Sequence, residues 1–169
     1  MIVSTLSCKK EDIILADDGI FKAESAGVTN GVLAAKYTCD GSGVSMLINW
    51  ANAPSGMRSF AVTMHHIPPT GDKHVYYLLY NIPAVTSLLT ENNSTVGLFG
   101  VNTVNGKTSY SPPCSQGPGA KLYVLTVYAL SAEPVFMVVQ SKVTIDILLA
   151  AISKTTQGSS AININYTRP

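Results

Sequence analysis

Apolar and polar positions alternate in short runs along most of the chain. Between residues 20 and 130, apolar or β-branched segments are separated by clusters of Gly, Pro, Asn, Asp and Ser. This spacing is typical of an all-β sandwich or barrel. The pattern predicts strands over residues 20–25, 33–37, 45–50, 59–64, 75–82 and 122–130.

The last part of the chain has a different pattern. Val143, Ile145 and Leu148 recur at helical spacing after Ser141, which we expect to be the N-cap of a helix. Gly158 separates this helix from residues 161–166, where Ile alternates with Asn as in a half-buried strand. The sequence therefore predicts a mainly β fold with one late helix and a C-terminal strand.

Residues 86–119 form the longest stretch without a repeating pattern, and they are rich in Asn, Gly, Ser and Pro. A loop of this length in a compact domain is usually functional or wraps a site. We therefore expect this segment to contribute to a binding or contact surface.

The composition narrows the function classes. The chain has 169 residues, a length typical of one domain. Only 12% of the residues are charged and the net charge is +1, so the chain lacks the basic field that a nucleic acid or an anionic membrane surface requires. No run of about 18 apolar residues is present, so the sequence predicts no transmembrane segment.

Motifs for catalysis are missing from the sequence. It has no Gly-x-Ser-x-Gly elbow, and most of its ten acidic residues lie near the N-terminus or are scattered singly. Gly106-Lys107-Thr108 imitates the end of a P-loop, but Val101 stands where the leading Gly is required. We therefore expect neither an enzyme nor a cofactor.

The first residues are set apart by their composition. A short apolar stretch ends at Cys8, and Lys9-Lys10-Glu11-Asp12 follows it. This arrangement resembles the end of a bacterial lipoprotein signal, in which the Cys becomes lipidated, although a complete signal has a longer apolar region. We expect that the true start lies upstream or was trimmed. Residues 1–18 are then a signal remnant and tether of an exported, membrane-anchored lipoprotein, and residues 19–169 are its domain. The alternative is a cytoplasmic protein with a solvated charge run at its N-terminus.

A series of short motifs follows one another in a distinctive order. In this order they resemble the bacterial branch of the phosphatidylethanolamine-binding protein family, the Raf kinase inhibitor-like proteins. The similarity covers about residues 19–168. The motifs are Tyr37-Thr38-Cys39-Asp40-Gly41, Trp50, Ala53-Pro54, Gly56, Ser59-Phe60-Ala61-Val62-Thr63, Tyr80-Asn81-Ile82-Pro83-Ala84, Tyr110, Pro113-Cys114, Gly117-Pro118 and the segment from Tyr123 to Tyr128-Ala129-Leu130.

The resemblance implies a Greek-key β-sandwich with a small pocket at one end that accepts phosphate-like anions. In the family, an Asp-Pro-Asp-x-Pro loop, a His and a Pro-rich loop leading to His-Arg-Tyr line this pocket. Here His66 stands where the first Asp is expected, and Tyr76 and Lys121 replace the two His. The expected ligand-binding residues are His66, Pro69, His74, Tyr76, Pro113, Lys121 and Tyr123.

These substitutions change the chemistry that the pocket would offer. The carboxylate is gone and Lys121 adds a positive charge. His74 lies two residues before Tyr76, so both side chains face the same way if a strand begins there. Because histidine ordinarily titrates near pH 6.5, we expect a small anion to bind more tightly at mildly acidic pH.

Two alternatives to an anion pocket stay open. The same residues could be solvated loop groups of a degenerate pocket. A metal site made of His65, His66 and His74 is disfavoured, because adjacent residues on a strand point in opposite directions and no nearby acidic ligand is evident.

The cysteines have two readings as well. Their wide spacing, without a Cys-x-x-Cys pair, argues against a structural zinc site. The resemblance places Cys39 and Cys114 in loop-bearing regions of the sandwich. In an exported protein a disulfide between them would tie the long loop to the sheet; the alternative is two buried thiols. Trp50, at the end of a predicted strand, is expected in the core.

The sequence thus predicts a non-enzymatic domain that binds a small phosphate- or carboxylate-bearing ligand. The alternative is a Raf kinase inhibitor-like interaction protein that inhibits a kinase or protease through residues 86–119. We expect no nucleic-acid partner and contact with a membrane only through the lipid anchor. The resemblance also suggests a homodimer.

Overall fold

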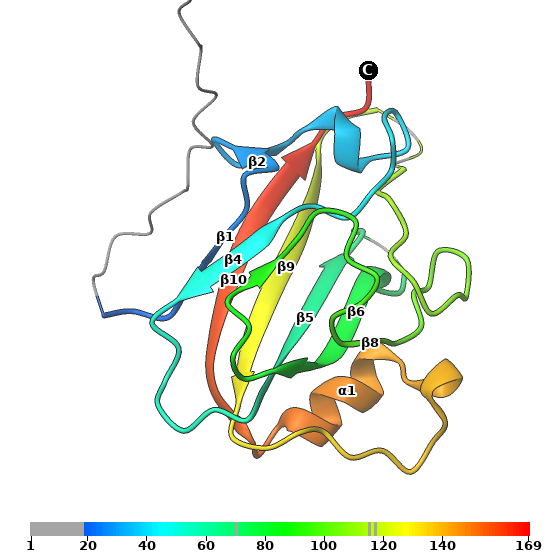
Figure 1. Ribbon diagram of the computed structural model, residues 1–169. Helices are drawn as coiled ribbons and strands as arrows, with labels where there is room; N and C mark the ends of the chain where they lie inside the picture. Colours follow the sequence, from blue (N-terminus) through cyan, green and yellow to red (C-terminus); the bar gives the residue numbers. More distant parts are fainter. Residues whose placement is uncertain (1–18, 70, 115, 117) are drawn as a thin grey trace, which may run out of the picture.

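Two β-sheets and one helix make up the fold in the computed structural model, which describes residues 19–69, 71–114, 116 and 118–169 (Figure 1). The smaller sheet has the strand order β1-β4-β7 and is antiparallel. Its strands are β1 (Lys22–Glu24), β4 (Ile48–Ala51) and β7 (Leu88–Leu89). It forms one layer of a sandwich.

The larger sheet has the order β2-β3-β10-β9-β5-β6-β8. All neighbours are antiparallel except β3 and β10, which are parallel. The strands are β2 (Val28–Thr29), β3 (Val32–Leu33), β10 (Thr156–Tyr166), β9 (Lys121–Leu130), β5 (Ser59–His66), β6 (His74–Pro83) and β8 (Leu98–Phe99). Non-consecutive strands are neighbours, so the expected Greek-key sandwich with a late helix and a C-terminal strand is confirmed.

The larger sheet is buried on both faces, because apolar residues occupy both sides of its central strands. On one face, Trp50 of the smaller sheet packs against Phe60 of β5 with a centroid distance of 5.1 Å. Trp50 is only 3% exposed, which confirms its predicted place in the core. On the other face, Leu148 of α1 (Ile145–Ile152) belongs to a cluster that includes Ala61 and Leu78 of β5 and β6.

One predicted strand is wrong. Residues 33–37 do not form a continuous strand, since β3 ends at Leu33 and a 3-10 helix, η1 (Ala35–Tyr37), follows. The hydroxyl of Thr38 and the amide of Thr38 both donate to the Ala35 carbonyl, which closes a tight turn. A Cβ at Gly41 would clash with the same carbonyl oxygen. Local hydrogen bonds and a close backbone approach therefore override the apolar pattern.

The helix begins later than the sequence predicts. Ser141 lies in a second 3-10 helix, η2 (Gln140–Lys142), and Thr144 is the N-cap of α1. The Thr144 hydroxyl accepts a hydrogen bond from the Ile147 amide at 3.4 Å. Both residues have a hydroxyl that could cap a helix, so composition alone did not distinguish them.

The segment 86–119 is held by asparagine side chains in addition to β7 and β8. The Asn102 amide group donates to the carbonyls of Lys107 and Ser109, and its oxygen accepts from the amides of Val104 and Asn105. Asn102 is fully buried, so these bonds satisfy a polar group that burial would otherwise destabilise. The long loop therefore has a defined shape.

Residues 1–18, with the predicted tether and Cys8, lie outside the described residues. Within the described part of the chain, no helix has the length and apolar character needed to cross a membrane.

Candidate functional site

A cavity of about 420 Å³ lies where β5 ends and where β6 and β9 begin. The pairing of His66 with His74 and with Tyr123 brings these three strand ends together. Segments from the long loop complete the wall. The described lining residues are His66, Pro68, Pro69, His74, Tyr76, Thr103, Val104, Cys114, Gln116 and Lys121.

Five of the seven predicted site residues line this cavity: His66, Pro69, His74, Tyr76 and Lys121. The other two do not line the cavity. Tyr123 is fully buried, and its ring packs against Tyr76 at 5.2 Å and His66 at 5.6 Å. Pro113 is buried, and its carbonyl accepts from the Cys39 amide at 3.0 Å.

A β-bulge places Tyr76 in the cavity wall. Met64 pairs with Tyr77 and His65 pairs with Val75, so Tyr76 is the extra residue of β6. Bulges often redirect a side chain next to a site. The Tyr76 carbonyl accepts from the Ser111 amide at 2.8 Å, so the bulge leaves no unpaired carbonyl and also anchors the long loop.

The ring of His66 has a fixed tautomer when neutral. Its Nδ1 lies 2.7 Å from the carbonyl oxygen of Leu122, which can only accept, so Nδ1 carries the proton. Nε2 is then the ring nitrogen left for a ligand, as an acceptor on a neutral ring or a donor on a protonated one. The His74 ring lies 6.2 Å from the His66 ring.

The charges around the cavity have one sign. Three lining residues can be cationic, namely His66, His74 and Lys121, and among the described lining residues none is Asp or Glu. Burial raises the pKa of the Tyr76 phenol, which therefore stays neutral and can donate a hydrogen bond. The cavity thus combines positive charge with neutral hydrogen-bonding groups, a chemistry that suits an anion.

His65 does not line the cavity. Burial lowers its pKa, with Lys73 and His66 adding to the effect, and its Nδ1 is buried without a hydrogen-bond partner. Among the described residues, no group of three or more His, Cys, Asp or Glu could hold a metal ion.

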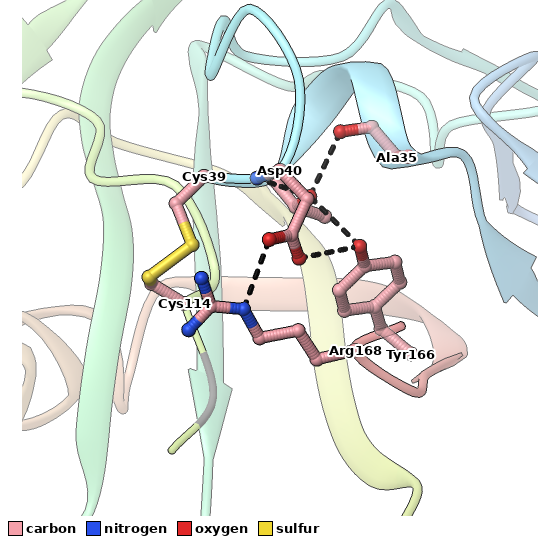
Figure 2. Close-up of a disulfide and its surroundings, with 7 residues drawn as sticks. Ala35, Cys39, Asp40, Cys114, Tyr166 and Arg168 are labelled. Atoms are coloured by element: carbon pink, nitrogen blue, oxygen red, sulfur yellow. Dashed lines mark hydrogen bonds and ion pairs between the residues drawn. A yellow bond between two sulfur atoms is a disulfide. The ribbon is translucent and has the colours of Figure 1, made fainter.

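A disulfide joins Cys39 to Cys114 in the wall of the cavity (Figure 2). Of the two readings of these cysteines, the structure has the disulfide rather than two buried thiols. Asp40, next to Cys39, accepts from the Tyr166 hydroxyl at 2.8 Å and from Nε of Arg168 at 2.9 Å. The Tyr166 hydrogen bond is the main cause of the lowered pKa of Asp40. The loop, η1 and the C-terminus are therefore tied together beside the cavity.

Sequence reasoning missed several lining residues. Thr103, Val104 and Gln116 come from the long loop, and no motif marks them. Asn102, next to Thr103, is the signal that could have helped, because a buried Asn often organises a turn. Cys114 was singled out only as a disulfide partner.

The sequence profile of the phosphatidylethanolamine-binding protein family matches residues 23–167. The chain belongs to this family. The chain is 33% identical over 125 residues to a UPF0098 protein of Aquifex aeolicus, and the matched region covers 70% of this chain and 72% of that protein. The UPF0098 protein YbhB of Escherichia coli is 30% identical over 101 residues, which are 56% of this chain and 64% of YbhB.

Solved structures of the phosphatidylethanolamine-binding protein family share the fold. The homologue CT736 from Chlamydia trachomatis superimposes with a TM-score of 0.80 over 89% of this chain and 99% of that protein, at 23% identity. YbcL of Escherichia coli, described as a new member of the mammalian PEBP family, gives a TM-score of 0.77 over 88% of this chain and 99% of its own, at 23% identity. At this level of identity the likeness shows the fold.

Proposed function

We propose that this chain is a non-enzymatic domain that binds a small anion, a phosphate or carboxylate group, in the cavity at the ends of β5, β6 and β9. The observation that carries the proposal is the lining by His66, His74 and Lys121 without a carboxylate among the described lining residues. The volume of about 420 Å³ lies at the small end of the range for ligand sites, which favours a small ligand.

Three side chains have distinct parts in this proposal. Lys121, at the first position of β9, supplies an ammonium group with three donors. His66 presents Nε2, because the Leu122 carbonyl holds Nδ1. Tyr76 adds a neutral hydroxyl from the bulge of β6. Charge-assisted hydrogen bonds of this kind are stronger than neutral ones, so a few of them can hold a small anion.

The absence of catalysis is part of the same proposal. Paired acid and base chemistry needs two titratable groups with opposed roles, and the described lining supplies no carboxylate for one of them. The Thr103 hydroxyl accepts from the Val75 amide at 2.8 Å, so its oxygen already serves the backbone. These features support a binding role.

NMR titration of the labelled protein with acetate, inorganic phosphate and phosphoethanolamine tests the proposal. We expect saturable shifts at the amides near His66, Tyr76 and Lys121. Lys121→Gln should weaken binding, whereas Lys154→Gln should not. Lys154 is a suitable control because it follows α1 and precedes the end of β10 that pairs with Leu130, while Lys121 pairs with Tyr166 at the other end of the same two strands. Unchanged binding in Lys121→Gln, or no saturable shifts, contradicts the proposal.

Acetate gives the clearest pH comparison, because it is ionised at both pH 6 and pH 7.5, whereas phosphate itself titrates in this range. A lysine ordinarily keeps its charge at both values. Tighter acetate binding at pH 6 would therefore indicate that imidazole groups contribute charge to the site. Identical affinities at the two pH values would mean that the imidazoles do not contribute charge to the site.

A second candidate function is inhibition of a kinase or protease through residues 86–119. The observation that favours it is the exposure of large apolar side chains on this segment, namely Leu88, Leu98 and Val104. Such a protein would bind a protein partner and would be indifferent to small anions. No anion response in the titration, together with saturable binding of a kinase or protease domain, would support it.

We also propose that the protein is exported and anchored through Cys8. The Cys39–Cys114 disulfide supports this, because stable disulfides form mainly in oxidising compartments. Intact mass of the natively produced protein, with and without reductant before alkylation, tests the proposal. Free thiols at both cysteines or an unmodified Cys8 would contradict it.

A further inference from the structure

The described lining of the cavity has side chains that can be cationic, but it has no carboxylate that could bind the ammonium group of a ligand. His66, His74 and Lys121 can each carry a positive charge, and the remaining polar lining residues that the structure describes are neutral. A ligand that carries both an anionic and an ammonium group would therefore find a site for only one of its two charges.

Asp72, in the loop between Pro69 and His74, is exposed and does not line the cavity. Two other acids are engaged elsewhere. Asp40, beside the disulfide that reaches the wall, binds Tyr166 and Arg168. Glu91 binds Lys36 and the Tyr37 hydroxyl. Neither could receive an ammonium group in the cavity without leaving its present partners.

Three backbone carbonyls next to the cavity already accept hydrogen bonds. The Leu122 carbonyl accepts from His66, the Tyr76 carbonyl from the Ser111 amide, and the Val75 carbonyl from the Thr103 amide. An ammonium group can be stabilised by carbonyl oxygens when no carboxylate is present. Here those oxygens already serve the fold.

From this arrangement we infer that the cavity selects anions that carry no positive charge and discriminates against zwitterions such as phosphoethanolamine. The inference rests on the proposed anion binding and names the ligand class: phosphate monoesters or carboxylates with a neutral substituent. Like charges about 8 Å apart, at an effective dielectric constant of about 40, repel enough to weaken binding roughly six-fold.

A matched pair of ligands tests the inference. Phosphoethanolamine and 2-hydroxyethyl phosphate have the same number of heavy atoms and differ in an ammonium or a hydroxyl at one end. Calorimetric titration of both at pH 7.5 and fixed ionic strength should give roughly six-fold tighter binding of the hydroxyl compound. Inorganic phosphate, titrated in parallel, reports whether the anion site itself exists.

Two variants at one position isolate the effect of charge. His66→Asp replaces the imidazole with a carboxylate. His66→Asn replaces the same imidazole with a neutral amide of nearly the same shape as the Asp side chain. His66 is partly exposed at the last position of β5, so both variants should fold. We expect His66→Asp to reduce or reverse the preference for the hydroxyl compound, and His66→Asn to keep it.

The outcomes are distinguishable. Equal or tighter binding of phosphoethanolamine by the wild-type protein overturns the inference and leaves the anion site in place. The same preference in His66→Asp and His66→Asn also overturns it, because the preference then does not arise from charge. No binding of any of the three phosphates overturns the proposed function and this inference together.

Discussion

Loss of the Cys39–Cys114 disulfide should destabilise the protein strongly. The two cysteines are separated by 75 residues in the sequence, and the bridge joins the segment after η1 to the end of the long loop. In the unfolded chain the bridge closes a large loop and removes conformations that an open chain would have. The double variant Cys39→Ser/Cys114→Ser restores that freedom to the unfolded state.

The magnitude follows from the loop length. For a loop of about 75 residues the chain-entropy relation gives about 15 cal/mol/K, or about 4.5 kcal/mol at 25 °C. Measured values are often lower, about 2–4 kcal/mol, because unfolded chains keep some structure. We therefore expect the double variant to lose about 3–4 kcal/mol of unfolding free energy.

Urea denaturation followed by tryptophan fluorescence measures this loss, because Trp50 lies in the core between the sheets. With a slope of about 2 kcal/mol/M, the midpoint should fall by about 1.5–2 M urea. Wild-type protein with a reductant should behave like the double variant, and the reductant should not change the double variant. A loss below about 1 kcal/mol, or a reductant effect on the double variant, would refute the reasoning.

Three further predictions concern single side chains. Tyr166→Phe removes the main group that lowers the pKa of Asp40. The destabilisation caused by this variant should therefore be present above the ordinary aspartate pKa near 4 and should shrink as the pH falls through the lowered pKa. Urea denaturation at several pH values measures this, and a pH-independent destabilisation would contradict it. Burial lowers the pKa of His65. As the pH drops below about 6.5, the unfolding free energy of the wild-type protein should therefore fall more steeply than that of His65→Gln. Parallel curves of unfolding free energy against pH would contradict this. Thr144→Ala should cost about 1 kcal/mol in thermal or urea unfolding, whereas Ser141→Ala should be nearly neutral; equal losses would mean that Thr144 is not the cap.

The long strands could be predicted from the sequence because their pattern agrees with their environment. β5, β6 and β9 were each predicted to within two residues, since most of their residues are apolar and turn residues flank them. Residues 33–37 are equally apolar, but hydrogen bonds of Thr38 close a turn there. A pattern of apolar positions does not reveal such local competition.

The site could be predicted on and next to the strands that carry it. His66, His74 and Lys121 lie at the last or first residues of their strands, so the family resemblance and strand register suffice to bring them together. Thr103 and Gln116 reach the cavity through the path of the long loop. That path depends on the buried Asn102 and on the disulfide, which are long-range tertiary features.

The position of the cationic residues also bears on how this cavity can differ in charge within one fold. His66 and Lys121 extend from strand ends and are only partly buried, so their side chains contribute little to the packing between the sheets. The shape of the cavity is instead held by the Tyr76 bulge, by the Thr103 bonds to Val75 and by the disulfide at Cys114. Because separate groups determine shape and charge, substitutions at the strand ends can reverse the charge of the cavity at small cost in stability. Charge is therefore the property of this cavity that substitutions can change most readily while the fold is retained.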